Sequence, residues 1–272
     1  MQTGEVSSTV SGESGTNAGI RFELTDDIAI ITLDRPSVGN VLDRPTLHAL
    51  MLAAIRVDED EAIRCVVLTG EGRLFCAGGD IPSFAAAGDR LPTLMKEITV
   101  YLNAAVSRLS RMNKPLVVAV NGAAAGAGLG LSLLGDIVIA SERASFTTAY
   151  TAIGLSPDGG VSWMLPRLVG LRRAQEFALG NRKIGADEAL SMGLVTSVVV
   201  HDALMPDALA AAQRLAKGSP SAVGALRTLF LSAFSETLET HLEMEARSIS
   251  RMTASPEAKA LAAQFAARRR TR

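Results

Sequence analysis

A run of 21 residues without a charged side chain, from Pro115 to Gly135, limits the possible folds of this chain more than any other feature. Its length would allow a helix to span a bilayer. Turn-forming residues divide the run, however: a β-branched stretch ends at Asn121-Gly122, and further glycines precede Asp136. An apolar stretch without alternation between turns is typical of a strand buried on both faces of a sheet. We therefore predict a buried strand and a turn here, and reject a membrane span.

Strand-like and helix-like segments alternate along the first 200 residues. The predicted strands cover residues 28–33, 64–69, 115–120, 136–140 and 194–200, and the predicted helices cover residues 46–57, 91–112, 171–179 and 186–192. This alternation indicates an α/β fold in which crossover helices join the strands. Beyond residue 203 the pattern is purely helical, with turn signals at residues 218–220. We expect a tail over residues 1–19, a core over 20–217 and a helical region over 218–272.

Composition excludes several classes of protein. The first 19 residues are rich in Gly, Ser and Thr and lack Lys and Arg, which predicts a disordered tail and no targeting signal. Two cysteines, Cys65 and Cys76, cannot build a disulfide framework, and no Cys/His cluster suggests a metal, so we expect a reducing cytoplasm. A net charge of −1 and 4% aromatic residues argue against a nucleic-acid partner.

The helical region carries two apolar stripes that nothing within the region itself would cover. The stripes consist of Leu226, Leu229, Phe230, Leu238, Leu242 and Met244. Exposed stripes of this kind are stable when another element packs on them. We expect a neighbouring subunit to do so.

Two glycine-rich segments, each directly after an apolar strand, are the main candidates for a site. They cover residues 74–80 (LFCAGGD) and 121–130 (NGAAAGAGLG). Small residues let the backbone approach a ligand and direct its N–H groups, as an oxyanion site requires. Tight turns and close helix packing would need the same residues. A dinucleotide-binding loop fits the second segment less well, because its glycines do not have the GxGxxG spacing.

Taken together, the two segments resemble motifs of the crotonase family, also called the enoyl-CoA hydratase/isomerase family. Residues 75–81 (FCAGGDI) are similar to its FxxGxDI motif, residues 121–136 to its second motif, and 165–170 and 189–195 to later ones. The resemblance covers the chain from about Arg21 onward. It implies a spiral of ββα units, a C-terminal helical trimerisation region, and a homotrimer or hexamer. It also implies an acyl-CoA substrate, whose coenzyme A takes the place of any separate cofactor.

The resemblance assigns the backbone N–H groups of Gly79 and Ala127 to an oxyanion hole for a thioester enolate. Hydratases of the family resemble each other in two glutamates, whose positions hold Gly130 and Tyr150 here. The nearest carboxylate is Asp158, within IGLSPDGG. Its position is similar to that of the catalytic aspartate of Δ3,Δ2-enoyl-CoA isomerases, including the ring-opening isomerases of phenylacetyl-CoA breakdown, and of the nucleophile of aromatic dehalogenases. Without that context, the PDG sequence would be an ordinary turn.

We therefore predict an isomerase that uses one base. Asp158 removes a C2 proton from a 3-enoyl thioester and returns it at C4, while Gly79 and Ala127 hold the dienolate oxygen. The residues expected to contact the substrate are Phe75, Ala77, Asp80, Ile81, Gly126, Tyr150, Leu155 and Trp163. Three alternatives stay open: a hydratase with Asp158 as its single carboxylate, an aromatic dehalogenase, and an acyl-CoA-binding protein without activity.

Overall fold

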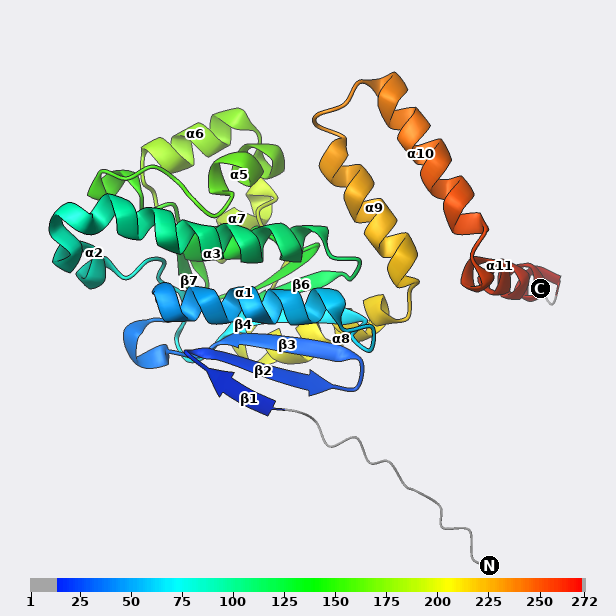
Figure 1. Cartoon of the computed structure of the whole chain (residues 1–272), viewed down its shortest axis with the longest axis horizontal. Helices are drawn as coiled ribbons and strands as arrows, with labels where there is room; N and C mark the ends of the chain where they lie inside the picture. Colours follow the sequence, from blue (N-terminus) through cyan, green and yellow to red (C-terminus); the bar gives the residue numbers. More distant parts are fainter. Residues whose placement is uncertain (1–13, 271–272) are drawn as a thin grey trace, which may run out of the picture.

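The computed structural model describes residues 14–270, which form two sheets surrounded by helices (Figure 1). The large sheet has the order β1 (Ser14–Asn17), β2 (Ile20–Thr25), β3 (Ile28–Leu33), β4 (Cys65–Gly70), β6 (Leu116–Val120), β8 (Ile137–Ser141) and β11 (Ser197–Val199). The small sheet has the order β10 (Ile184–Gly185), β9 (Ser145–Thr147), β7 (Ala123–Ala125) and β5 (Leu74–Cys76). The strands from β3 to β11 of the large sheet are parallel, as are β5, β7 and β9.

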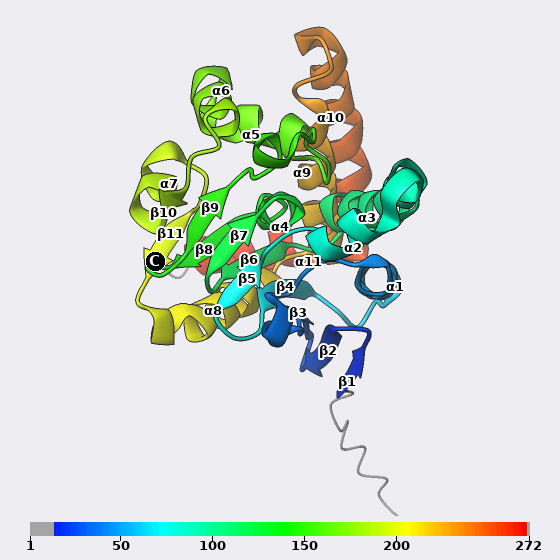
Figure 2. The same cartoon turned by 90° about the vertical axis from the view of Figure 1, so that its left-hand side faces the viewer.

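Three successive ββα units build the core as a spiral. Each unit gives one strand to each sheet, in the pairs β4 and β5, β6 and β7, and β8 and β9. The first pair leads into α2 (Ile81–Ala87) and α3 (Leu91–Arg111), the second into α4 (Ala127–Ser132) and the third into α5 (Val161–Val169). Figure 2 shows the small sheet beside the large one, with α4 next to β7. The predicted α/β spiral is confirmed.

The central strands lie between two helical layers, which explains their uniformly apolar sequence. Alternate side chains of the large sheet face α1 (Arg44–Glu59) and α3 on one side and α8 (Leu204–Ala216) on the other. In β4, for example, Val66 and Leu68 belong to the first layer, and Cys65 and Val67 to the second. Strands β4 and β6 are buried at every residue. No helix among residues 14–270 is both long enough and apolar enough to cross a membrane.

The sequence analysis was wrong about part of the tail and missed β2 and all four strands of the small sheet. Residues 14–17 form β1, which pairs antiparallel with β2, so the predicted disorder does not extend to residue 19; residues 1–13 lie outside the described part of the chain. Strands β5, β7 and β9 have three residues each, too few for a periodic pattern to predict them. The remaining helices are α6 (Leu171–Leu179), α7 (Ala186–Met192), α9 (Pro220–Ser232), α10 (Leu238–Thr253) and α11 (Pro256–Arg270).

A buried arginine ties α9 to the core. Arg227 is 7% exposed, and its guanidinium donates to Asp136 Oδ1 at 2.9 Å and to the carbonyls of Leu109, Met112 and Lys114 at 2.7–2.8 Å. The second carboxylate oxygen of Asp136 accepts from the Leu116 N–H, at the start of β6. Helix α9 is therefore fixed to the end of α3 and to the segments that lead into β6 and β8.

Replacing Arg227 with methionine is expected to lower the free energy of unfolding by about 2–3 kcal/mol. The substitution keeps much of the side-chain volume but leaves Asp136 and three carbonyls without their charged donor. Urea unfolding followed by circular dichroism measures the change. Arg247→Met is the control, because that side chain is exposed on α10 and pairs with the exposed Glu243. The variant should stay within about 0.5 kcal/mol of the wild type. Equal stabilities of the two variants would contradict the anchoring role.

Helices α10 and α11 extend away from the core (Figure 1). Apolar side chains on α9, α10 and α11 are exposed. Leu226, Phe230, Leu238 and Leu242 of the predicted stripes are exposed in the single chain, as are Ile249, Leu261 and Phe265. Leu229 and Met244 are partly buried instead, because both line a crevice between α9 and α10.

Candidate active site

A cavity of about 630 Å³ lies beyond the carboxyl ends of the small sheet's parallel strands. Gly79 follows β5, Ala127 follows β7, and Tyr150 and Asp158 follow β9; all four line the cavity. Helices α2 and α3 supply an apolar wall made of Ile81, Phe84, Met95, Ile98 and Leu102, of which the sequence analysis had assigned only Ile81 to the site. The apolar stripe of the predicted helix 91–112 was the available signal, but it fits core packing equally well.

The loop after β5 presents the Gly79 N–H through close backbone packing. The Ala77 N–H donates to the Gly39 carbonyl at 2.9 Å, and the Gly78 carbonyl accepts from the Leu42 N–H at 2.8 Å. Gly78 has a φ of +93°, which disfavours any residue with a side chain. At Gly79 a Cβ atom would lie 2.6 Å from the Phe84 ring. Gly78 is therefore required by the local geometry, whereas a side chain at Gly79 would displace the Phe84 ring.

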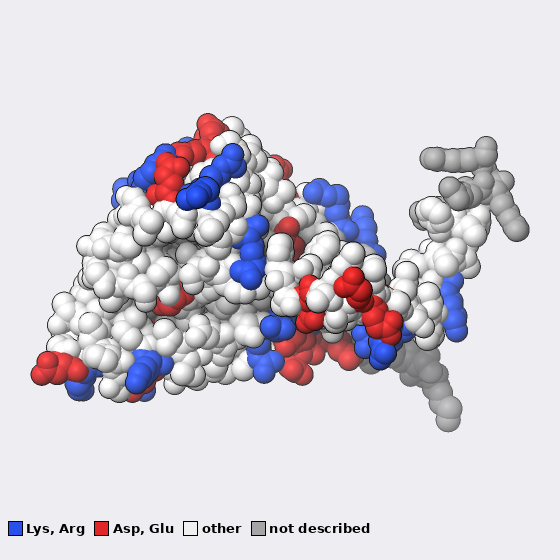
Figure 3. Space-filling view, turned by 90° about the horizontal axis from the view of Figure 1, so that it is seen from above, with Lys and Arg blue, Asp and Glu red and all other residues white. Residues whose placement is uncertain are grey.

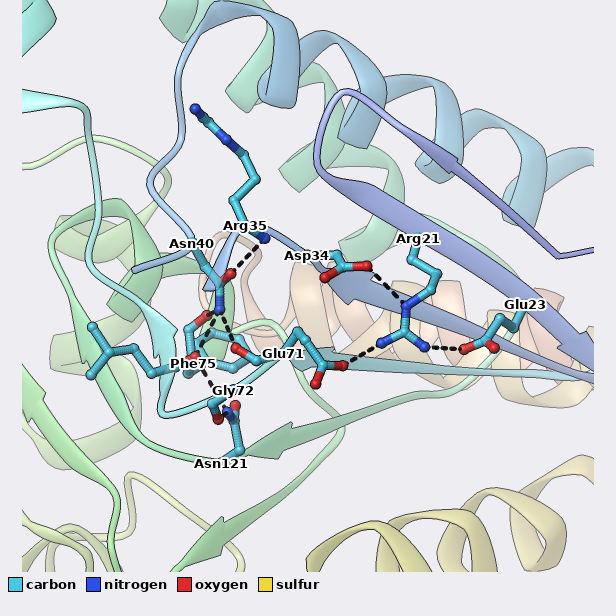
Figure 4. A network of polar contacts seen from close by, with 10 residues as sticks. Arg21, Glu23, Asp34, Arg35, Asn40, Glu71, Gly72, Phe75 and Asn121 are labelled. Carbon is cyan, nitrogen blue, oxygen red and sulfur yellow. Dashed lines mark hydrogen bonds and ion pairs between the residues drawn. The ribbon is translucent and has the colours of Figure 1, made fainter. Parts of the chain in front are cut away.

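Asn40 holds β5 and the turn that precedes it, a role that the sequence analysis missed (Figure 4). Its Nδ2 donates to the carbonyls of Glu71, Leu74 and Phe75 at 2.9, 2.8 and 3.2 Å, and its Oδ1 accepts from the Arg35 N–H at 2.8 Å. The side chain is 2% exposed, and the backbone has a φ of +57°, which asparagine tolerates better than most residues.

Asn121 adds a second amide to this network, donating to the carbonyls of Gly72 and Leu74 at 2.8 and 3.3 Å. Next to it, Arg21 bonds to Glu23, Asp34 and Glu71. Strand β5, which carries the loop to Gly79, is therefore held on both sides by side-chain hydrogen bonds.

The second N–H donor, Ala127, opens α4. At the first position of a helix the N–H has no intrahelical acceptor, so it is free to bind a ligand. Gly126 turns the chain into the helix with a φ of +54°. Gly128 is needed for packing, because a Cβ there would lie 2.4 Å from the Cys76 carbonyl. The glycines of this segment thus serve both close packing and presentation of an N–H.

Asp158 and Tyr150 form a direct contact at the cavity. The Tyr150 hydroxyl donates to Asp158 Oδ1 at 2.7 Å. Burial raises the pKa of Asp158 above the usual aspartate range, while the hydrogen bond from Tyr150 acts in the opposite direction. Burial, with the nearby Asp158 charge, also raises the pKa of the Tyr150 phenol, so tyrosine is the proton donor of the pair. A desolvated carboxyl of raised pKa is typical of a general base.

The structure separates the predicted substrate contacts into two groups. Those that line the cavity are Ala77, Ile81, Gly126, Tyr150 and Leu155. Those that do not line it are Phe75, Asp80 and Trp163. Phe75 is fully buried in the core, the Asp80 carboxylate accepts from Ser83, and the Trp163 ring lies 3.9 Å beneath the Arg167 guanidinium. Side chains in a motif point alternately inward and outward, so a shared motif does not place all of them at one cavity.

Other reactive side chains are unsuited to catalysis here. Cys76 is fully buried and burial raises the pKa of its thiol to about 12, so it stays protonated. His48, His201 and His241 do not line the cavity. Among residues 14–270, no group of three or more His, Cys, Asp and Glu side chains is placed to hold a metal ion.

Comparison with known proteins identifies the family. The family model described as enoyl-CoA hydratase/isomerase matches residues 23–272. The chain belongs to the enoyl-CoA hydratase/isomerase family. A Rhodobacter capsulatus protein named "Probable enoyl-CoA hydratase" is 43% identical over 228 residues, covering 84% of this chain and 87% of the relative. The 1,2-epoxyphenylacetyl-CoA isomerase of Escherichia coli is 37% identical, covering 80% and 84%. The 4-chlorobenzoyl coenzyme A dehalogenase-2 of an Arthrobacter species is 34% identical, covering 87% and 86%.

Solved structures of the enoyl-CoA hydratase/isomerase family share the whole architecture. An enoyl-CoA hydratase from Polaromonas sp. JS666 superposes with a TM-score of 0.87 at 32% identity, covering 92% of this chain and 97% of the other. An enoyl-CoA hydratase/isomerase from Cupriavidus metallidurans superposes with a TM-score of 0.87 at 30% identity, covering 93% and 95%. The family resemblance seen in the glycine-rich motifs is thereby confirmed.

Proposed function

We propose that this family member is an enoyl-CoA isomerase that moves a double bond from the Δ3 to the Δ2 position of an acyl-CoA thioester. The observation that carries the proposal is a lone carboxylate in an apolar cavity. Among the described residues that line the cavity, Asp158 is the only Asp or Glu, and Lys96 is the only other charged residue. A 1,3-proton shift needs one base, because the base that takes the proton also returns it.

The surroundings of Gly130 support an isomerase over a hydratase that uses two carboxylates. Gly130 stands where the family resemblance places one hydratase glutamate, and a Cβ at this position would lie 3.0 Å from the Gly159 carbonyl. The other glutamate position holds Tyr150, a neutral phenol bonded to Asp158. Neither residue can hold and activate water as a carboxylate does. Hydratase activity with Asp158 alone is the second candidate, since the Rhodobacter relative carries a hydratase name.

The proposed reaction follows from the positions of three groups. Asp158 takes a proton from C2 of the 3-enoyl thioester, and the electron pair moves into a dienolate. The N–H groups of Gly79 and Ala127 bind the thioester oxygen on which the negative charge develops. Asp158 then gives the same proton to C4, which leaves the 2-enoyl product and regenerates the carboxylate. The apolar wall from α2 and α3 keeps water from the dienolate.

Two further candidates, an aromatic dehalogenase and an acyl-CoA-binding protein without activity, have weaker support. A dehalogenase would form an ester between its aspartate and the aryl group, and a base must then activate water to hydrolyse it. The described residues lining the cavity include no histidine and no second carboxylate for that step. A binding protein without activity would have no need for a buried base with a raised pKa. We therefore rank the dehalogenase and the binding protein below the isomerase and the hydratase.

Incubation with a panel of thioesters in deuterated water tests the proposal. The panel contains a linear 3-enoyl-CoA, a cyclic 3-enoyl-CoA, a 2-enoyl-CoA and a 4-chlorobenzoyl-CoA. An isomerase is expected to give 2-enoyl product from a 3-enoyl substrate without an added hydroxyl group, and C4 should carry mostly protium because the same proton is returned there. Fast hydration of the 2-enoyl thioester without conversion of the 3-enoyl thioesters would identify a hydratase instead. Binding without any turnover would refute both enzymatic activities.

We also propose that the chain forms a homotrimer or a pair of trimers, with the exposed faces of α10 and α11 buried between copies. Four apolar side chains on α10 and α11 support this, namely Leu238, Leu242, Ile249 and Phe265, each at least 52% exposed. Light scattering coupled to gel filtration should give three or six times the 28.5 kDa chain mass. Leu242→Glu together with Phe265→Glu should shift the mass toward the monomer, whereas Glu239→Gln on the same helix should not. A monomeric wild type would contradict the proposal.

The remaining expectations about partners and compartment stay predictions. On the described part of the face in Figure 3, basic and acidic side chains lie in small mixed groups without one continuous basic patch. Such a face is not typical of nucleic-acid binding. Both cysteines are free and buried, as a reducing cytoplasm would require.

A further inference from the structure

We propose that Tyr150 is a positioning residue: its hydroxyl holds Asp158 Oδ1 so that Oδ2 carries the proton between C2 and C4 of the substrate. The inference rests on the proposed isomerase function for the identity of the reaction, but the hydrogen bond itself does not depend on it. Neither the names of the relatives nor the motifs assign a role to this tyrosine.

The contact is built into the loop that follows β9. The Tyr150 backbone carbonyl accepts from the N–H groups of Ile153 and Leu155 at 3.1 and 3.0 Å, which folds residues 150–155 into a compact turn. The Asp158 carbonyl accepts from the Val161 N–H at 3.1 Å, just before α5. Backbone bonds therefore set where the phenol and the carboxyl group lie, and the 2.7 Å side-chain contact then sets the rotation of the carboxyl group.

Because the Tyr150 side chain is buried, its hydroxyl donates the hydrogen bond and the Asp158 carboxylate accepts it. The tyrosine is 7% exposed, so its hydroxyl has little access to water as an alternative acceptor. Since burial and the adjacent carboxylate both raise the pKa of the phenol, the proton stays on tyrosine. A hydroxyl that donates to Oδ1 draws electron density to that oxygen and leaves Oδ2 as the more basic one. The proton therefore leaves C2 for Oδ2, the C2–H electron pair enters the dienolate, and the O–H bond at Oδ2 breaks when the proton reaches C4.

Few other ionisable groups face this pair. Lys96 of α3 lines the same cavity, and Cys76 of β5 lies near enough to the phenol to raise its pKa slightly. Burial keeps the Cys76 thiol protonated, and no charged partner contributes to the pKa of Asp158. The pKa of Asp158 thus depends on two opposing effects. Burial raises it, and hydrogen bonds to the carboxylate, chiefly from Tyr150, lower it. Removing the hydroxyl should raise the pKa further.

Tyr150→Phe tests this assignment, because it removes the hydroxyl and keeps the buried ring. Isomerase activity of the wild type falls as the pH drops through the pKa of Asp158, since only the ionised carboxylate accepts a proton. In the variant, the acid limb of kcat is expected to lie about 1–2 pH units higher. The plateau value of kcat is expected to be about tenfold lower, because the carboxyl group is no longer oriented. Tyr101→Phe is the matched control, because Tyr101 is the only other tyrosine and its ring contacts His48. The acid limb of kcat in the Tyr101→Phe enzyme should match that of the wild type.

A direct titration of Asp158 separates this inference from the proposed function. The infrared carboxyl band that disappears in Asp158→Asn reports its protonation without any substrate. If the band titrates at higher pH in Tyr150→Phe while no 3-enoyl thioester turns over in the wild type, the contact stands and the proposed function is wrong. An unchanged titration, or an acid limb that stays in place or moves to lower pH in an active Tyr150→Phe enzyme, would overturn the positioning role.

Discussion

Asp158→Asn is expected to lower the kcat for isomerisation of a 3-enoyl-CoA by about 10²–10⁴-fold. Asparagine has the same shape as aspartate, and its carbonyl oxygen can still accept the hydrogen bond from Tyr150. What it lacks is a carboxylate that can take a proton from C2 and return it at C4. No other Asp or Glu among the described residues lines the cavity to replace it. Stopped-flow absorbance at the wavelength of the conjugated 2-enoyl thioester measures the loss.

Two controls show that such a loss is chemical. The Kd for a saturated acyl-CoA, measured by calorimetry, should change less than kcat, because the asparagine leaves the apolar wall and both N–H groups in place. Asp187→Asn, an exposed carboxylate in the first turn of α7, should keep the wild-type rate. If Asp158→Asn turned over the 3-enoyl thioester at the wild-type rate, another group would have to be the base, and the proposed mechanism would be abandoned.

Ala127→Pro is expected to lower the same kcat by about 10²–10³-fold, because it removes one of the two N–H donors of the oxyanion hole. Proline is well tolerated at the first position of a helix, where no intrahelical hydrogen bond is lost. The preceding Gly126 has φ +54° and ψ −126°, the mirror image of the extended conformation that residues before proline prefer. The helix should therefore form, and the loss should be confined to the missing donor and the space that the ring occupies.

Ala127→Gly provides the matched comparison, since it trims the side chain and keeps the N–H. It should retain a kcat close to that of the wild type, and circular dichroism should show both variants folded. Comparable losses in the two variants would mean that the methyl group of Ala127, rather than its N–H, supports catalysis. A wild-type rate in Ala127→Pro would remove this residue from the oxyanion hole.

The sequence predicted the parts of this structure that depend on local pattern. Continuous apolar runs predicted β3, β4, β6 and β8 within one residue at each end, because burial between two helical layers requires apolar residues at every position. The glycine-rich segments stood out because close approach of backbones allows few other residues, and the resemblance to the family motifs then assigned Gly79 and Ala127. The small sheet had no such signal, because its strands are too short to show a period.

Sequence patterns did not predict the contacts between segments that are far apart in the chain. Nothing in the residues around Asn40 indicates that its amide bonds to three carbonyls more than 30 positions away. Phe84 of α2 and Met95, Ile98 and Leu102 of α3 were not assigned to the site for a similar reason, since an apolar stripe looks the same whether it faces a strand or a substrate. Phe75 does not line the cavity, because membership of a motif does not fix the direction of a side chain.

The three units of the spiral divide the chemistry between them. In the proposed mechanism the first two, ending at the adjacent parallel strands β5 and β7, supply the two N–H donors. The third, ending at β9, supplies Tyr150 and Asp158. With this arrangement, substitutions in one unit could change the proton-transfer groups, while the backbone of the other two units continues to supply the N–H groups for the enolate. For protein engineering, the loop at 150–158 is therefore the place to introduce a new reaction.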